Sequence, residues 1–129
     1  MSDFRLKLNS RNLPPDFPRE FDAHIYYDQT KEEEASRFRE LALSHWKGPD
    51  VFVGFMIDCP VGPHPVPMFE INFPRRLFGE VTLWLLHHHG NLSILVHELT
   101  GDDYKDHTDY ALWIGKPVEL DLNAFGKKN

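Results

Sequence analysis

The chain has a single cysteine among its 129 residues, which excludes two kinds of stabilising site. Cys59 cannot form an intramolecular disulfide, and without a second cysteine the chain cannot build a cysteine-rich zinc site. The sequence also lacks an apolar run of about 18 residues, the length that a membrane span requires, and its polar N-terminus contains no signal-peptide core. We therefore predict a cytoplasmic protein with no membrane-spanning segment.

Positive charge is scarce as well. The chain carries 14 Lys and Arg against 20 Asp and Glu, a formal net charge of -6. Nucleic acids and anionic membranes are bound by basic surfaces, so neither is an expected partner. The sequence contains no GxGxxG, no P-loop and no GxSxG, which disfavours nucleotide chemistry and serine hydrolysis. Small molecules and other protein surfaces remain as candidate partners.

Alternating and helical patterns define one domain over residues 21–122, with an extended proline-rich arm at 1–20 and a charged tail at 123–129. The patterns predict strands at 21–27, 51–57, 68–73 and 92–99, and helices at 30–46 and 74–89. Thr30 and Glu33 have the spacing of a capping box. After residue 100 we expect a short helix or loop at 107–113 and a strand at 118–122.

The order strand, helix, strand, strand, helix, strand is the split βαβ pattern of ferredoxin-like α+β domains. We therefore predict a four-stranded antiparallel sheet with both helices on one face, and a C-terminal extension. The first strand lies between the third and fourth in this topology. The other sheet face would expose Phe52, Met56, Met68, Leu95 and Leu99, and an exposed apolar area of this size is typical of an interface, so we expect a homodimer.

Polar residues are predicted to gather on the face of the sheet away from the helices. Side chains alternate along a strand, so His24, Glu70 and His97 would lie on this face, on three neighbouring strands about 5 Å apart. Two imidazoles and a carboxylate form a facial site for divalent iron. His64, on a stiff loop of four prolines, could supply a third nitrogen or replace Glu70. Taken singly, each residue is as readily explained as a surface or core residue.

Two further histidine groups need interpretation. Consecutive residues on a helix point about 100° apart, so His87, His88 and His89 cannot close on one ion, and they suit a helix C-terminus instead. Asp106 beside His107 could orient an imidazole for proton transfer. The same stretch reads equally well as an Asp-rich turn that caps a helix.

Four separated motifs carry a family resemblance: FDAHIYYD at 21–28, PVGPHP at 60–65, LVH at 95–97, and DHT at 106–108 with WIG at 113–115. Over residues 21–122 the chain resembles the DOPA 4,5-dioxygenase family of small ferredoxin-like proteins. The resemblance implies an extradiol dioxygenase that opens the ring of L-DOPA or another catechol with O₂ at a non-haem Fe(II), although another divalent metal such as zinc could occupy a purified sample.

The resemblance also implies roles for individual residues. Metal or catalytic roles fall on His24, His64 and His97, and an acid/base or substrate role falls on His107. Glu70 or His64 would complete the metal site, and we expect Tyr26, Asn72 and Trp113 to contact the substrate. Two alternatives stay open: a non-enzymatic dimeric module that binds a metal or a small aromatic, and a cofactor-free monooxygenase of the dimeric α+β barrel type.

Overall fold

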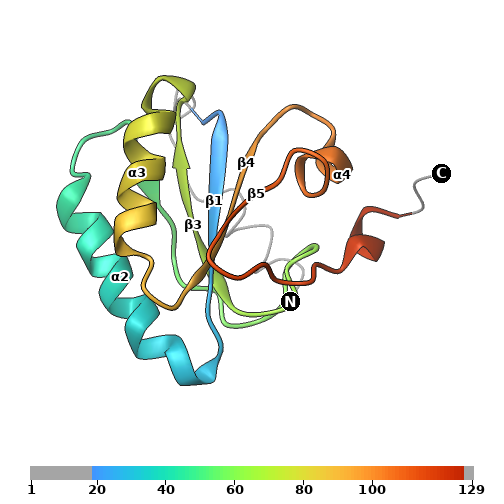
Figure 1. Cartoon of the computed structure of the whole chain (residues 1–129), viewed down its shortest axis with the longest axis horizontal. Helices are drawn as coiled ribbons and strands as arrows, with labels where there is room; N and C mark the ends of the chain where they lie inside the picture. The colour runs from blue at the N-terminus through green and yellow to red at the C-terminus, as the bar shows by residue number, and fades with distance from the viewer. Residues whose placement is uncertain (1–18, 127–129) are drawn as a thin grey trace.

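The computed structural model describes residues 19–126, which form one antiparallel sheet with helices (Figure 1). The strands are β1 (Phe21–Tyr26), β2 (Phe52–Val53), β3 (Met68–Phe73), β4 (Ser93–Glu98) and β5 (Leu112–Ile114). The helices are α2 (Glu32–His45), α3 (Phe78–His88) and α4 (Asp103–Asp106), and 3-10 turns span η1 (Gln29–Lys31), η2 (Arg75–Leu77) and η3 (Leu122–Phe125). The arm predicted at 1–20 lies almost wholly outside the described residues.

The strand order β2-β3-β1-β4-β5 confirms the predicted α+β sheet with β1 at its centre. β1 pairs antiparallel with both neighbours: His24 is opposite Glu70 on β3, and Asp22 is opposite His97 on β4. The sheet has five strands rather than four, because β5 adds to the free edge of β4. Among residues 19–126, none of the helices combines the length and apolar character that crossing a membrane requires.

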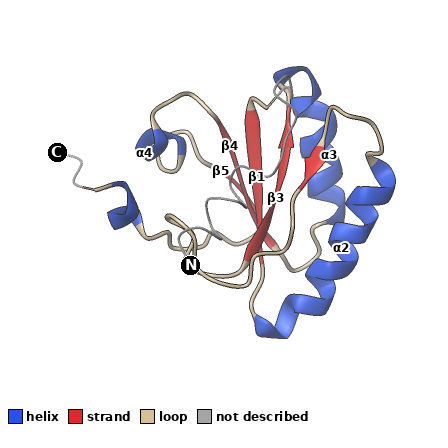
Figure 2. Cartoon of the chain, turned by 180° about the vertical axis from the view of Figure 1, so that it is seen from behind, coloured by secondary structure: helices blue, strands red, loops and turns tan. Residues whose placement is uncertain are grey.

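α2 and α3 cover one face of the sheet, as Figures 1 and 2 show from opposite sides. The core beneath them is built from alternate strand residues and from the inner stripe of each helix: Ala23 and Ile25 of β1, Phe69, Ile71 and Phe73 of β3, Ile94 and Val96 of β4, Phe38 of α2, and Val81 and Leu85 of α3. Full burial of one such large apolar side chain contributes about 1.5–3 kcal/mol relative to exposure.

The opposite face is also covered, which corrects the expectation of an open apolar surface. Met68 and Leu95 have no exposed area, and they pack with Tyr26, Ile57 and Val61 in a second apolar cluster. Loop residues Cys59 and Val66 and the C-terminal residues Ala111, Trp113, Val118 and Leu120 pack against this cluster. The homodimer stays a prediction, but Met68 and Leu95, two of the residues from which we inferred it, are covered by this chain itself, while Phe52 and Leu99 are half-buried.

The second predicted strand is the least regular part of the sheet. Residues 51–57 form regular strand pairs with β3 at Phe52–Val53, one further backbone bond from Gly54 to Glu70, and an isolated bridge from Ile57 to Met68. Between these points the alternation slips by one residue, so Met56 packs on the helix side and Ile57 on the other side. A slip of one residue reverses the faces of a strand, so the outward position predicted for Met56 was wrong.

Two local predictions were also wrong. Asp28, rather than Thr30, caps the first helical turn, because its carboxylate accepts the Thr30 backbone N–H at 2.9 Å and also the Thr30 hydroxyl. The additional strand is Leu112–Ile114 and not 118–122, which has no regular structure up to η3. The alternation at 118–122 instead places Val118 and Leu120 against the second apolar cluster.

Candidate functional site

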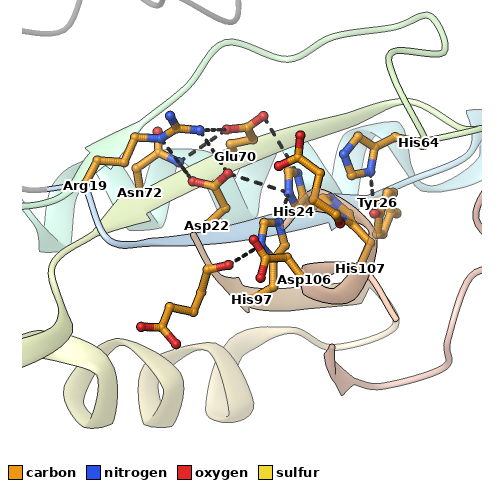
Figure 3. Close-up of polar contacts among 12 residues, drawn as sticks. Arg19, Asp22, His24, Tyr26, His64, Glu70, Asn72, His97, Asp106 and His107 are labelled. Carbon is orange, nitrogen blue, oxygen red and sulfur yellow. Dashed lines mark hydrogen bonds and ion pairs between the residues drawn. The ribbon is translucent and has the colours of Figure 1, made fainter. Parts of the chain in front are cut away.

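β1 positions the candidate site because its side chains on the face away from α2 and α3 are Asp22, His24 and Tyr26. All three are buried, as are Glu70 and His97 on the two neighbouring strands. Figure 3 shows that these strands bring the side chains predicted to form the site to one place, where His64 and His107 join them from loops.

His24 and His97 form a close pair, with 3.0 Å between their Nε2 atoms. The Nδ1 of His97 lies 3.0 Å from the carbonyl oxygen of Glu98. Because a carbonyl can only accept, His97 carries its hydrogen on Nδ1 and directs the lone pair of Nε2 toward His24. His97 is therefore held in the tautomer that a metal ligand needs.

Asp22 belongs to the site although the sequence did not single it out. Its Oδ2 lies 3.9 Å from the Nε2 of His24. Arg19 donates to both carboxylate oxygens, at 3.2 and 2.9 Å, and the amide of Asn72 donates to Oδ1 at 2.5 Å. The signal that could have identified Asp22 is its position two residues before His24, on the same face of the central strand.

Glu70 occupies a different position from the one that a ligand shared with His97 requires. Its Oε2 lies 3.8 Å from the Nδ1 of His24, on the opposite side of that ring from the nitrogen that faces His97. Glu70 also accepts from the Asn72 amide at 3.2 Å and lies 3.9 Å from a guanidinium nitrogen of Arg19. This position suits a group that orients His24 from outside.

His64 approaches from the proline loop, which the fold holds rigidly. Val61 and His64 exchange backbone hydrogen bonds of 3.1 and 2.9 Å, and Gly62 between them has a φ of 53°. The backbone N–H of Asp121, in the C-terminal segment, donates to the carbonyl of Pro63 at 2.8 Å. The ring of His64 lies 4.1 Å from that of His24, and its Nδ1 lies 2.7 Å from the Tyr26 hydroxyl.

His107 completes the cluster at the end of α4. Its ring lies 4.3 Å from that of His97, and its Nδ1 lies 2.7 Å from the carbonyl oxygen of Asp103. The expected orientation of His107 by Asp106 was wrong. Asp106 is fully buried, and its carboxylate accepts from the backbone N–H and hydroxyl of Thr100 at 3.0 and 2.6 Å.

The electrostatic environment keeps the loop histidines neutral. Burial lowers the pKa of His64 to about 3, with smaller contributions from His107 and His97. Burial and His97 also lower the pKa of His107, against the opposing effect of its hydrogen bond to Asp103. Burial raises the pKa of the Tyr26 phenol well above its usual range, and the Glu70 carboxylate adds to the increase. Neutral imidazoles have a nitrogen lone pair available for a metal or a proton.

The donor set fits a divalent metal ion. In the described part of the chain, two groups place one ligand atom from each member within 4.8 Å of the others: Asp22, His24 and His97, and His24, His64 and His107. The Nε2 atoms of His24 and His97 lie 3.0 Å apart, and the Oδ2 of Asp22 lies 3.9 Å from the Nε2 of His24, so these three groups would reach a single ion. His24 belongs to both groups, and Glu70 to neither.

The remaining predicted residues lie in distinct places. Trp113 stacks on Tyr26 with ring centres 5.9 Å apart, whereas Asn72 has no exposed area and lies behind the two carboxylates. The nitrogens of His88 and His89 lie 2.8 and 3.0 Å from the carbonyl oxygens of Trp84 and Leu92, at the end of α3. These contacts agree with the helix-end interpretation of the histidine run.

A family model and one named relative identify the family of this chain. The sequence model of the Dopa 4,5-dioxygenase family matches residues 21–124. The chain is 39% identical over 116 residues to an uncharacterized 21.2 kDa protein of Botryotinia fuckeliana, a match that covers 80% of this chain and 61% of that protein. It is 36% identical over 110 residues to the DOPA 4,5-dioxygenase of Amanita muscaria, covering 81% and 48%. The chain thus spans only about half to three fifths of the length of these relatives.

A solved structure supports the fold at similar identity. The chain is similar to a protein of Nostoc punctiforme PCC 73102 that is described as a candidate dioxygenase, with a TM-score of 0.77 and 36% sequence identity. The match covers 83% of this chain and 90% of that protein.

Proposed function

The chain belongs to the Dopa 4,5-dioxygenase family, and from that premise we propose that it opens the ring of L-DOPA or a related catechol with O₂ in a metal-dependent extradiol reaction. The observation that carries the proposal is the meeting of Asp22, His24 and His97 on one buried face of the sheet. Two imidazoles and one carboxylate are the donor set of non-haem Fe(II) oxygenases.

In this proposal Asp22, His24 and His97 hold Fe(II). Bound there, the ion would act as the Lewis acid that activates the catechol toward O₂. The surrounding side chains fix the geometry of this site: Arg19 and Asn72 hold the Asp22 carboxylate, and Glu70 faces the outer nitrogen of His24. Such outer contacts orient ligands, and their loss typically lowers metal affinity 10–100-fold.

The assignment changes two of the roles expected from the sequence. Asp22 replaces Glu70 as the carboxylate of the triad, because its oxygen lies on the same side of the His24 ring as the nitrogen that faces His97. Asn72 becomes a residue that positions the carboxylates instead of one that contacts the substrate, because its side chain is buried behind them.

His107 is the proposed proton acceptor for the catechol. Its Nδ1 hydrogen is donated to the carbonyl of Asp103, so the lone pair is on Nε2. The ring lies beside His97 and packs against Phe125, with centres 5.0 Å apart. A neutral imidazole in this position can take a catechol hydroxyl proton at Nε2. The substrate oxygen is then left as an anion.

The test is anaerobic reconstitution with Fe(II), followed by air and L-DOPA, with O₂ uptake and a yellow ring-opened product as readouts. We expect both signals in the wild type and in His88→Gln, whose histidine lies exposed at the end of α3, and neither signal in His24→Ala. The His88 variant controls for the loss of a histidine in general.

Two results would replace the proposal with one of its alternatives. Stoichiometric Fe(II) with no O₂ uptake across several catechols would favour a metal-binding module without turnover. Oxygen uptake that survives thorough chelation would favour a cofactor-free monooxygenase, for which neither His24 nor His97 is needed.

A further inference from the structure

We propose that Tyr26 donates its phenolic hydrogen to Nδ1 of His64, and that this bond makes His64 a hydrogen-bond donor to a substrate oxygen and not a metal ligand. The inference rests on the catechol dioxygenase function proposed above. It assigns Tyr26 a positioning role in place of the substrate contact expected from the sequence.

The geometry reduces the question to the direction of one hydrogen bond. The Tyr26 hydroxyl lies 2.7 Å from the Nδ1 of His64, and the two residues are only 2% and 4% exposed. A neutral imidazole has one nitrogen that donates and one that accepts. Whichever way this bond runs, it therefore determines which of the two nitrogens of His64 carries the hydrogen (Figure 3).

The surroundings of Tyr26 favour donation by the phenol. Within residues 19–126, the Tyr26 hydroxyl is hydrogen-bonded to His64 alone. If His64 donated instead, the phenolic hydrogen would be buried with no acceptor in that part of the chain, and buried donors are nearly always paired. The phenol is also the stronger acid and the imidazole nitrogen the stronger acceptor of the two groups. Trp113 stacks on the Tyr26 ring, and this contact restricts the positions that the phenol can adopt.

Donation by Tyr26 places the hydrogen of His64 on Nε2, on the side of the ring away from the phenol. In the metal-free chain both His24 and His64 carry a hydrogen on Nε2, but only His24 has an acceptor on its outer side. Its Nδ1 faces the Glu70 carboxylate at 3.8 Å, so the hydrogen can move to Nδ1 and leave the Nε2 lone pair to a metal. The same move in His64 would leave the Tyr26 hydrogen without an acceptor among residues 19–126, so the group of His24, His64 and His107 is disfavoured as the ligand set. The group of Asp22, His24 and His97 can serve once the His24 hydrogen is on Nδ1. The rings of His24 and His107 lie 4.1 and 5.5 Å from that of His64, so its N–H group borders the same space.

The other partners in the cluster show the contrast. The outer nitrogens of His97 and His107 contact backbone carbonyl oxygens, which only accept, so both rings keep the lone pair on Nε2. The outer nitrogen of His64 contacts a hydroxyl that can donate. His64 and His107 are thus complementary: one donates to a substrate oxygen and the other accepts a proton from one.

The first measurement needs no variant. Long-range ¹H–¹⁵N NMR of metal-free protein labelled at histidine distinguishes protonated from unprotonated ring nitrogens, and the signals of His64 are those missing from His64→Gln. We expect Nε2 to carry the hydrogen in the wild type and a shift toward Nδ1 in Tyr26→Phe. A wild-type His64 with its hydrogen on Nδ1 would overturn the proposal.

The second measurement is anaerobic binding of Fe(II) alone, by competition with a ferrous chelator. We expect the Kd of Tyr26→Phe and His64→Gln to stay within about threefold of the wild type, whereas His97→Gln should raise it at least tenfold. The control Tyr110→Phe, which removes an exposed phenol, should match the wild type. A tenfold weaker Kd in His64→Gln would identify His64 as a ligand and refute the proposal.

Turnover separates this inference from the proposed function. If the wild type consumes no catechol, the proposed function fails, while NMR and Fe(II) binding still decide the state of His64. If the wild type does consume catechol, Tyr26→Phe should lower kcat while its Fe(II) affinity stays unchanged. An unchanged kcat would refute the positioning role of Tyr26.

Discussion

Mild acid should destabilise the metal-free fold through His64. Burial lowers the pKa of this imidazole from the usual 6.5 to about 3 in the folded chain. The unfolded state therefore binds a proton that the folded state does not, and stability rises with pH wherever this difference persists. The contribution of His64 is fully present above about pH 6.5, and it is lost progressively as the pH falls from there toward 3.

The size of the effect follows from the same two values. Each pH unit between them changes the free energy of unfolding by about 1.4 kcal/mol for one proton, so going from pH 7 to pH 5 should remove about 2 kcal/mol. His107 has a lowered pKa as well, and it adds to the loss in the same direction. A loss of this size is a large part of the 5–15 kcal/mol that stabilises a typical domain.

The assay is urea unfolding at pH 7 and pH 5 with a chelator present, for the wild type, His64→Gln and the exposed-histidine control His88→Gln. The wild type and the control should lose stability equally between the two pH values, whereas His64→Gln should lose about 2 kcal/mol less. Comparing the pH-dependent change removes the constant cost of the lost bond to Tyr26. Equal losses in all three proteins would show that His64 is not a buried neutral group and would refute the reasoning.

Two further predictions concern the fold. Gly115 has a φ of 76°, and a Cβ there would lie 2.9 Å from the carbonyl oxygen of Leu92. Gly115→Ala should therefore lower the free energy of unfolding by more than about 1 kcal/mol, whereas Gly48→Ala, with open space around it, should lower it little. Equal urea midpoints for the two variants would contradict this. Phe69→Ala should lower the free energy of unfolding by about 3–5 kcal/mol because the ring is fully buried. Leu41→Ala, at a side chain that is 54% exposed, should lower it by less than about 0.5 kcal/mol. A smaller loss of stability for Phe69→Ala than for Leu41→Ala in the same assay would show that the core is assigned wrongly.

The regular strands and their faces could be predicted because period-two alternation is a local property of the sequence. Ala23 and Ile25 against His24 and Tyr26 define the two faces of β1, and the split βαβ order then places this strand at the centre of the sheet. The convergence of His24 and His97 follows from those two facts. The four motifs that suggested the family lie within the residues that the family model matches.

The parts that could not be predicted depend on contacts between distant segments. The alternation at 118–122 is typical of a strand, but these residues pack on the second apolar cluster, and the edge of β4 pairs with Leu112–Ile114 instead. Leu41 fits the apolar stripe of α2 by spacing, yet its side chain is 54% exposed among residues 19–126. Asp22 was identified as a strand residue but not as a site residue. Its place in the site depends on Arg19 and Asn72, which hold its carboxylate toward His24.

The histidines of the cluster show why composition alone cannot assign chemistry. The sequence assigned metal or catalytic roles to His64 and His97 and an acid/base or substrate role to His107, although an imidazole can act as ligand, donor or base at any of these positions. Their roles diverge in the fold through one atom each: a carbonyl oxygen on the outer nitrogen of His97 and of His107, and a phenolic hydroxyl on that of His64. Since the outer partner fixes the tautomer, it also fixes whether the inner nitrogen offers a lone pair or a hydrogen. Replacing Tyr26 should therefore change the chemistry of the site without touching any of the residues that we propose hold the metal.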